Sequence, residues 1–501
     1  MSDHAYQILA ILIYFALMIA IGYYAYRKTS SVNGYMLAER QLSPAMAALS
    51  ANAADMSAWL LMGLPGAIYL SGVIQAWMAI ALTIGAWFNW KLVAPRLRAY
   101  TEIAGNSITI PTFFARRFRR HAVGLRVTAS LIILVFFTFY VSSGLVASGK
   151  FFHATFGWSY YAGMAVVGMV TVLYTLFGGF LGATMTDMAQ GLLMLAALIA
   201  VPLVAVFNMG GWGNAATHIV AAKPDAFNFF SGIDQLGVGA FVVGLISIMA
   251  WGLGYFGQPH IIVRFMALRT AHEARISRKI SFVWMMLTTG GAVLTALIGI
   301  GYFAQHRDRA PQDPETVFLL LSQIFFHPFV AGLVLAAVLA ATMSTMSSQL
   351  IVCSSAMVED IYALMGRKHS ARTLLILSRA SVLAVSIVAA LFALNQNSAV
   401  LQLVSFAWAG FGAAFGPIVL LSLFWRRLTA RGAFAGLVTG AVVVFVWGSI
   451  PALHQTMYEI LPGFLLNLAV AYVVSRFTYQ PDADVDADFD QMLAVVADPT
   501  K

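Results

Sequence analysis

Residues 48–66 read ALSANAADMSAWLLMGLPG, a stretch of apolar and small residues that contains one acid, Asp55. A carboxylate at the depth of a bilayer costs on the order of 2.5–3.5 kcal/mol, so it persists where a bundle interior, a cation or water compensates it. Gly63, Pro65 and Gly66 follow, and they favour a helix whose backbone opens beside the buried charge. The stretch therefore predicts a broken membrane helix of the kind that lines an ion pathway.

The composition is that of a polytopic membrane protein. Of 501 residues, 60% are hydrophobic and 10% are charged, whereas soluble domains carry about 25% charged residues. Many apolar runs reach the roughly 20 residues that a spanning helix needs, and β-barrel strands would instead alternate over short segments. The single cysteine, Cys353, excludes a disulfide framework and a cysteine metal cluster. We expect an all-α bundle, and we expect the first apolar run to be retained because it lacks a basic segment and a cleavage site.

Apolar runs and helix-breaking residues predict thirteen spans. They are 6–26, 44–71, 73–93, 123–150, 160–181, 187–209, 237–264, 278–304, 317–363, 373–394, 399–424, 431–449 and 457–477. With the N-terminus outside, the 29 Lys and Arg residues all lie in cytoplasmic segments except Lys150, Lys223, Arg307 and Arg309. The net charge of +9 then reflects membrane topology rather than nucleic-acid binding, and the C-terminus is cytoplasmic.

Two predicted spans are interrupted near their middles, and their positions suggest internal symmetry. One is 44–71, and the other is 237–264, which contains Trp251–Pro259 (WGLGYFGQP). Each opens a block of five spans, and because five is odd the two blocks enter the membrane from opposite faces. This arrangement is an inverted repeat, in which the broken helices mark a substrate site near the midplane.

Two stretches resemble ligand-binding motifs but lack the features that those motifs require. Residues 252–257 match G-x-G-x-x-G, but they lie in a predicted membrane span and follow no strand, so we do not expect a dinucleotide there. Residues 482–490 resemble the start of a calcium loop but lack Gly at the sixth and Glu at the twelfth position. We expect them to form a solvated, disordered acidic tail.

Hydroxyl side chains gather in the segment Ala340–Ser348. Ser344 and Ser348 share one helical face, and Thr345 lies beside it. Each hydroxyl could simply bond the carbonyl one turn earlier. Alkali cations prefer oxygen ligands, so these hydroxyls with carbonyls freed by the broken span 44–71 would instead form a weak, releasable cation site.

Further candidates have two interpretations each. Asp187 opens the span 187–209, where it is either a helix cap or part of a gate paired with a basic residue such as Arg40. Aromatic residues could face lipid or wall a pocket for a small apolar solute. They are Trp59, Tyr140, Trp251 and Tyr255.

Four segments together resemble the sodium/solute symporter family, in particular its bacterial proline-transporting members. They are Ser57–Ala67, Trp251–His260, Ala340–Thr345 and Ser405–Pro417. The resemblance covers nearly the whole chain. It implies a LeuT-type core of ten helices at 44–424, with inverted repeats at about 44–209 and 237–424. One extra helix then lies in 1–43, two lie in 425–480, and 481–501 form the acidic cytoplasmic tail.

The same resemblance implies sodium-coupled import of L-proline across the bacterial cytoplasmic membrane by alternating access, with sodium entering first. It implies a sodium site formed by carbonyls of Ala53, Met56 and Ala341 and by hydroxyls of Ser344 and Thr345. It implies proline-binding residues Ser57, Trp59, Tyr140, Trp251 and Tyr255. It implies coupling or gating roles for Asp55, Arg40, Asp187, Gly63 and Pro259.

Other functions remain as alternatives. A transporter could carry another small amino or organic acid, or use a proton as its coupling ion, and a transporter-like membrane sensor is a further candidate. A channel would show rings of polar residues along a pore, which the sequence lacks. We expect no enzymatic activity and no cofactor. The expected partners are L-proline, Na+ and membrane lipid, without nucleic acid or an obligate protein partner.

Overall fold

The computed structural model describes residues 2–28, 37–119, 122–233, 237–365 and 370–498. Within these ranges all regular structure is helical apart from one isolated bridge between Leu42 and Leu268. Eleven of the described helices are long and apolar enough to cross a bilayer, and the bent pair Pro44–Asp55 with Trp59–Ser71 adds a twelfth. The all-α membrane architecture expected from the sequence is confirmed.

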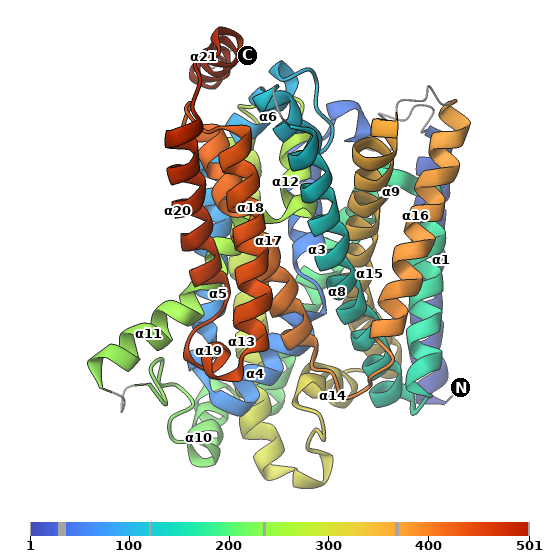
Figure 1. Cartoon of the computed structure of the whole chain (residues 1–501). Coiled ribbons are helices and arrows are strands. Elements are labelled where there is room, and N and C mark those ends of the chain that lie inside the picture. Colours follow the sequence, from blue (N-terminus) through green and yellow to red (C-terminus); the bar gives the residue numbers. More distant parts are fainter. Residues whose placement is uncertain (1, 29–36, 120–121, 234–236, 366–369, 499–501) are drawn as a thin grey trace.

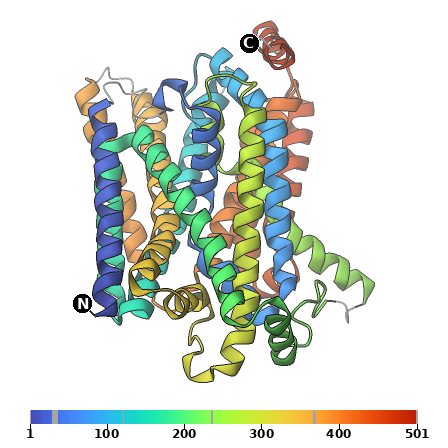
Figure 2. The same cartoon turned by 180° about the vertical axis from the view of Figure 1, so that it is seen from behind.

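The long helices stand side by side as one bundle, with α1 at one edge and α20 at the other (Figures 1 and 2). They are α1 (Asp3–Lys28), α3 (Pro44–Asp55) with η2 (Trp59–Gly63) and α4 (Leu64–Ser71), α5 (Ala76–Phe88), α8 (Val123–Phe156), α9 (Tyr160–Asn208), α11 (Val238–Met249) with η5 (Ala250–Gly257) and α12 (Pro259–Met266), α13 (Ala274–Gln305), α15 (Pro328–Ser355), α16 (Ala371–Phe392), α17 (Val400–Phe424), α18 (Ala430–Ser449) and α20 (Ile460–Thr478).

Shorter helices lie at the two ends of the bundle. They are η1 (Ala38–Arg40), η3 (Val73–Gln75), η4 (Asn89–Val93), α6 (Ala94–Ile103), α7 (Ile110–Phe118), α10 (Trp212–Ala222), η6 (Arg307–Arg309), η7 (Pro314–Thr316), α14 (Val317–Phe325), η8 (Ala356–Ile361), η9 (Tyr362–Met365), α19 (Pro451–Thr456) and α21 (Ala483–Ala497). The face with α10 and α14 carries the N-terminus, and the opposite face carries α6 and α21 (Figure 1).

Both interruptions predicted from the sequence are present. The helix α3 ends at Asp55 because Met56 leaves helical geometry (φ −78°, ψ 72°), and the chain resumes after a bend of 60°. The second interruption is η5, which ends at the extended residue Gln258 (φ −80°, ψ 105°). A residue before proline disfavours helical backbone, so Pro259 fixes this end and begins α12. At Gly254 a Cβ would lie 1.9 Å from Trp408 Nε1, so glycine lets η5 approach α17.

The expected number of thirteen spans is not confirmed in the described chain. The predicted spans 160–181 and 187–209 form one continuous helix, α9, with a bend at Gly179 (φ 57°, ψ −158°). Glycine adopts this backbone geometry readily, so the two segments follow one another without a loop. The predicted span 317–363 also differs, because α14 is a separate helix and the long helix begins only at Pro328.

The acidic tail is helical, so the expectation of disorder is wrong. Asp482 caps α21 by accepting hydrogen bonds from the backbone N–H groups of Asp484 and Val485. Acidic residues in a first turn also suit the helix dipole. Phe489 and Met492 lie one turn apart and are buried against the rest of the chain.

Candidate functional site

Asp55 lies where α3 breaks, and its carboxylate joins the two broken helices. Its Oδ2 accepts a hydrogen bond from the Tyr255 hydroxyl on η5. Its Oδ1 is buried and has no hydrogen-bond partner among the described residues. In the described part of the chain no Lys or Arg forms an ion pair with it. One oxygen of a buried acid is thus left for a group that brings positive charge.

Neutral oxygens gather beside this acid. The Ser344 hydroxyl on α15 donates to the Ala53 carbonyl at 2.7 Å, and it lies 3.1 Å from the Ala341 carbonyl. The Thr345 hydroxyl contacts the same Ala341 carbonyl at 3.1 Å. Met56 is the first residue after α3 and lies at the break itself. Carbonyl and hydroxyl oxygens are the ligands that hard cations prefer, so the cluster is suited to a small cation with few charged ligands.

Aromatic rings enclose the other side of the break. The Trp59 indole donates to the Asp55 carbonyl at 3.4 Å, and its side chain is 2% exposed. On η5, Trp251 stacks on Tyr458 with ring centroids 5.1 Å apart, and Tyr255 meets Trp408 edge-on at 5.1 Å. The Trp408 indole also donates to the Trp251 carbonyl at 2.8 Å.

Polar side chains also lie among these rings. The Tyr140 hydroxyl is buried without a hydrogen-bond partner among the described residues, and the Asp55 carboxylate and the Ser57 side chain lie near it. The Ser57 side chain is 3% exposed. The five positions expected to bind solute therefore surround one region, from α8, the α3–η2 break and η5. Aromatic walls with a few convergent polar groups are typical of small-molecule sites.

Trp408 and Tyr458 are further ring residues of this region that the sequence analysis did not assign. Trp408 lies in the segment Ser405–Pro417 that carried the family resemblance, so its position was available from the sequence. Tyr458 lies just before α20 and donates its hydroxyl to the Ser405 carbonyl at 2.6 Å. No local pattern marks it.

A second buried acid, Asp187, has a resident cation. Its Oδ2 lies 3.0 Å from Arg264 Nη2 and accepts a hydrogen bond from the Ser50 hydroxyl at 2.7 Å. Arg264 also donates to the Ser348 hydroxyl at 2.5 Å and to the His260 carbonyl. We call Ser50, Asp187, Arg264 and Ser348 the lock, because they join α3, α9, α12 and α15. Ser344 and Ser348 are one turn apart, so the lock lies directly beside the oxygen cluster.

Two expectations about these charges are wrong. Asp187 lies inside α9 and therefore does not cap a helix. It pairs with Arg264 rather than with Arg40. Arg264 itself is fully buried. Its position inside the predicted span 237–264 was the available indication that it is buried.

Arg40 instead fixes the end of α12. It donates to Asn106 Oδ1 at 2.7 Å, to Thr101 Oγ1 at 3.1 Å and to the Met266 carbonyl at 2.5 Å. Burial, with a smaller contribution from the Arg98 charge, lowers the pKa of Arg40 to about 10, so it stays charged at neutral pH. Arg40 therefore lies outside the region around Asp55.

Gly63 and Pro259 act through backbone shape. At Gly63, in η2, a Cβ would lie 3.2 Å from the Leu401 Cβ, so a larger residue would press on α17. Pro259 begins α12 directly after the extended residue Gln258. Both residues lie at the ends of the interrupted segments, where a change of helix direction would occur.

Comparisons with known proteins agree in family and in fold. The model of the sodium:solute symporter family matches residues 35–440. The high-affinity proline transporter PutP of Bacillus subtilis (strain 168) is 52% identical and covers 94% of this chain and 98% of its own. The osmoregulated proline transporter OpuE of the same strain is 47% identical over 95% of each chain. The sodium/proline symporter of Staphylococcus aureus (strain NCTC 8325 / PS 47) is 45% identical over 97% of this chain and 95% of its own.

Among solved structures, a Na+-coupled sialic acid symporter in a substrate-bound outward-open state is similar over 95% of this chain and 98% of its own. The TM-score is 0.81 and the sequence identity is 18%. At this identity the likeness establishes the fold alone.

Proposed function

The chain belongs to the sodium:solute symporter family, and we propose that it imports L-proline together with Na+ by alternating access. The relatives that are 45–52% identical over nearly full length are named as proline transporters or sodium/proline symporters. The structural observation that carries the proposal is the free oxygen of Asp55 beside the Ser344–Ala53 contact. A buried acid without a resident cation next to neutral oxygens suits a cation that binds and leaves.

In this proposal the sodium ion is held by uncharged oxygens and Asp55 supplies the charge. The ligands are the carbonyls of Ala53, Met56 and Ala341 and the hydroxyls of Ser344 and Thr345. The Ser344 hydroxyl, which donates to the Ala53 carbonyl, would turn so that both oxygens face the ion. Because the Ala53 and Met56 carbonyls lie at the end of α3, and the Ala341 carbonyl and both hydroxyls belong to α15, the bound ion fixes the two helices to each other.

Proline binds next to the ion among Ser57, Trp59, Tyr140, Trp251 and Tyr255. Its apolar ring packs on the indole and phenol rings. As a zwitterion it needs partners of both signs, and the Tyr140 hydroxyl, Ser57 and the Asp55 carboxylate are polar groups of this region. Tyr255 donates to Asp55 and also lines the ring wall, so it links the ion to the solute.

The lock acts as the cytoplasmic gate. Ser50 and Ser348 lie one turn beyond the oxygen cluster on α3 and α15, and Arg264 holds both of them to Asp187. An ion that leaves along these helices meets Asp187 only after Arg264 moves away. Arg40 holds the end of α12 through the Met266 carbonyl. Gly63 and Pro259 let the broken helices change direction.

The fold proposed for this mechanism is a LeuT-type pair of inverted repeats, at about 44–209 and 237–424, with thirteen spans in all. The helix α9 supplies two of them. A straight helix of its 49 residues would be roughly 70 Å long, more than twice the hydrocarbon thickness. Gly182 lies against Ala25 near the end of α1, whereas α10 follows α9 at the face of the N-terminus (Figure 1). Both observations support two crossings that meet at Gly179.

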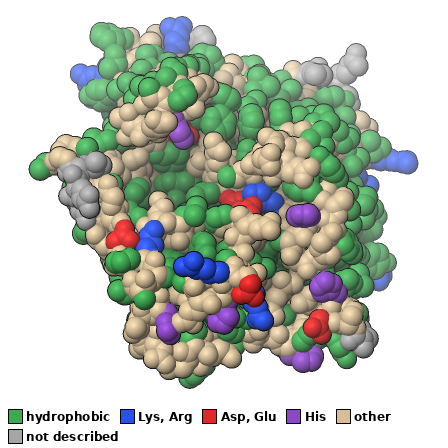
Figure 3. Space-filling model, turned by 90° about the horizontal axis from the view of Figure 1, so that it is seen from below, with side chains coloured by type: hydrophobic (Ala, Val, Ile, Leu, Met, Phe, Trp, Pro, Cys, Tyr) green, Lys and Arg blue, Asp and Glu red, His purple; other side chains and the backbone are tan. Residues whose placement is uncertain are grey.

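The proposed location is the cytoplasmic membrane, with the N-terminus outside and the tail inside. On the face that carries the N-terminus, basic side chains occur in small groups beside acidic ones (Figure 3). The distribution of Lys and Arg along the chain also supports an orientation with the N-terminus outside and the tail inside.

The energetics suit a one-ion symporter. Proline carries no net charge, so the membrane potential acts through the ion. One sodium ion that crosses about 100 mV supplies roughly 2.3 kcal/mol, and a tenfold gradient adds about 1.4 kcal/mol. Together they support a several-hundred-fold accumulation without covalent chemistry.

Uptake of labelled proline into proteoliposomes tests the function. We expect saturable uptake that an inward sodium gradient accelerates and that a proton gradient alone does not. Saturable uptake indifferent to sodium would contradict the coupling ion. Absence of proline uptake, with uptake of another small amino or organic acid, would contradict the substrate.

A further inference from the structure

The C-terminal helix α21 is docked on the face of the bundle opposite the N-terminus (Figure 1). Phe489 is 5% exposed and Met492 is fully buried. The Phe489 ring meets Tyr100 of α6 edge-on at 6.1 Å, and it lies under the Arg117 guanidinium of α7 at 5.9 Å. Phe489 and Met492, together with the partly buried Leu493, Val495 and Val496, thus anchor a helix whose first half is acidic.

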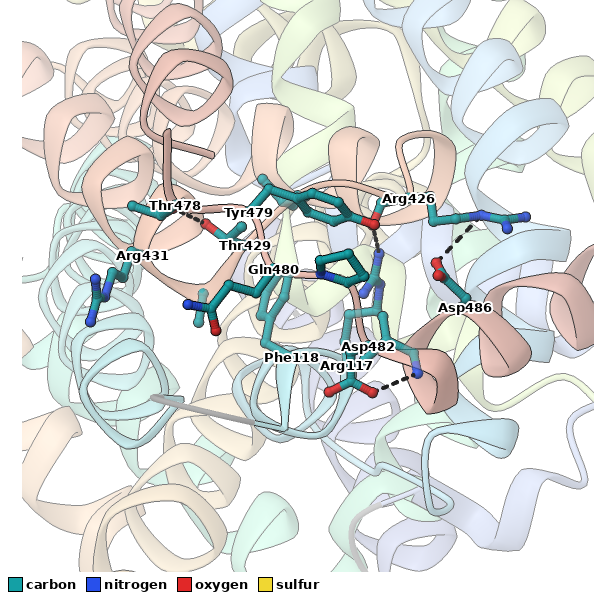
Figure 4. Close-up of a pocket in the computed structure, with 14 residues that line it drawn as sticks. Arg117, Phe118, Arg426, Thr429, Arg431, Thr478, Tyr479, Gln480, Asp482 and Asp486 are labelled. Atoms are coloured by element: carbon teal, nitrogen blue, oxygen red, sulfur yellow. Dashed lines mark hydrogen bonds and ion pairs between the residues drawn. The ribbon is translucent and has the colours of Figure 1, made fainter. Parts of the chain in front are cut away.

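Four ion pairs surround this anchor. Arg119, which follows α7, lies 2.8 Å from both Asp484 and Asp488. Arg426, in the turn between α17 and α18, pairs with Asp486 at 3.7 Å (Figure 4) and also with Asp490. One helix therefore bridges two turns that are far apart in the sequence.

The contact is only partly packed. A cavity of about 130 Å³ remains between the start of α21 and the α17–α18 turn, and Arg117, Phe118, Thr429, Asp482 and Asp486 are among its lining residues (Figure 4). The side chains of Arg119 and Arg426 are about two-fifths exposed. Exposed pairs of this kind are weak singly and are screened by salt.

Helix α6, which Phe489 of α21 contacts, is connected to the helix that carries Arg264 of the lock. In α6, Arg98 donates to the carbonyls of Leu268 at 2.5 Å and of Arg269 at 2.8 Å, which directly follow α12. Thr101 of α6 accepts a hydrogen bond from Arg40, which also holds the Met266 carbonyl. Since α12 carries Arg264, a chain of contacts runs from α21 through α6 to the lock.

We propose that α21 is a salt-sensitive latch on the cytoplasmic gate. While docked it holds α6, and through α6 the end of α12, in the arrangement in which the lock is closed. A rise of ionic strength on the cytoplasmic face screens the four pairs, because the Debye length falls from about 10 Å at 0.1 M to about 3 Å at 1 M. The helix then leaves its site, and the lock opens more often.

The first test measures sodium-driven proline uptake into proteoliposomes whose lumen, facing the tail, holds about 0.05 or 0.5 M KCl. In the unmodified protein we expect the rate to rise roughly threefold to tenfold at high salt, as four weak pairs acting together allow. The double variant Arg119→Asp, Arg426→Asp starts at the high rate and changes less than about twofold. Removal of residues 481–501 has the same effect.

A matched control separates the latch from a general effect of charge. Arg431→Asp makes the same change of charge at the start of α18, and Arg431 lines the cavity without an ion pair to the tail among the described residues. We expect this variant to keep the salt response. Adding Asp484→Arg and Asp488→Arg to Arg119→Asp restores the pairs with opposite sign and should restore the salt response in part.

The uptake measurement rests on the proposed function, so a second readout uses no substrate. Amide hydrogen exchange in α6 and α12 reports release of the latch directly. We expect salt to accelerate it in the unmodified protein and in Arg431→Asp, and we expect fast, salt-independent exchange in the double variant. Equal exchange and equal salt response in the unmodified protein and the double variant would overturn the latch, whether or not proline is the substrate.

Discussion

Asp55, the last residue of α3, and Asp187, which contacts α3 from α9, are both buried acids, but their surroundings differ. Asp187 has a guanidinium at 3.0 Å and a serine hydroxyl at 2.7 Å. Asp55 has only the Tyr255 hydroxyl, and its second oxygen has no partner in the described chain. A buried charge is tolerated when it is paired, and an unpaired one calls for a partner from outside the chain. We infer that Asp55 interacts with an ion that binds and leaves. Asp187 belongs to a gate in which Arg264 is its permanent partner.

The largest expected effect comes from Asp55→Asn, which keeps the shape of the side chain and removes its charge. A unit charge about 4 Å from an ion contributes roughly 4 kcal/mol in a partly shielded site, so sodium-driven proline uptake should fall at least about a hundredfold. Initial uptake rates under an imposed sodium gradient measure this. The amount of protein in the membrane, determined in parallel, should be unchanged. A rate within a few-fold of the original would remove Asp55 from the coupling role.

Loss of the paired acid Asp187 should lower the stability of the protein, because it leaves the buried Arg264 without a partner. Arg264→Met or Asp187→Leu alone leaves one buried charge unpaired and should lower stability by about 3–5 kcal/mol. The double variant removes both charges and should regain most of the loss. Thermal unfolding of the purified protein measures all three, and strictly additive losses would contradict the lock. Transport should be impaired in the double variant as well, since the gate is lost.

A smaller effect is expected at the oxygen cluster. Ser344→Ala removes one neutral ligand, which contributes about 1.4 kcal/mol, so the sodium concentration for half-maximal uptake should rise about tenfold. Thr342→Ala is the matched control, because its hydroxyl bonds the Val338 carbonyl of its own helix at 2.9 Å. An equal shift in both variants would mean that the effect is structural.

The smallest effect on stability is expected at an acid in solvent. Asp484 is 73% exposed and pairs with Arg119 at 2.8 Å. Asp484→Asn should therefore change the free energy of unfolding by less than about 1 kcal/mol. Thermal unfolding at low and high salt checks this, and a loss as large as that of Asp187→Leu would contradict the ranking of the acids by burial.

Much of this fold could be predicted from local sequence. Apolar run length gave the membrane helices, and Pro259 with its preceding glycines gave the second broken helix. The number of spans could not be confirmed, because the predicted spans 160–181 and 187–209 form one continuous helix that bends at Gly179. The order in the tail was missed because it depends on Phe489 and Met492 packing on distant surfaces, whereas the local composition is acidic.

Part of the candidate site could also be predicted from local sequence, and part of it could not. Asp55 and the hydroxyls near Ser344 could be found because polar groups in an apolar helix are costly wherever they lie. The partner of Asp187 could not, because the Asp187–Arg264 contact joins residues 77 positions apart. A basic residue near the end of a span is also ordinarily assigned to the adjoining loop. Pairing across helices has no local pattern, and the three-dimensional structure is needed to establish it.

The most direct test of the central difference between the two acids is equilibrium binding of labelled proline to the purified protein over a range of sodium concentrations. In the unmodified protein, sodium should raise the affinity for proline. Asp55→Asn should bind proline weakly and with no dependence on sodium, whereas Asp187→Asn should keep a sodium dependence even where its transport is impaired. A sodium-dependent affinity in Asp55→Asn equal to that of the unmodified protein would contradict the account.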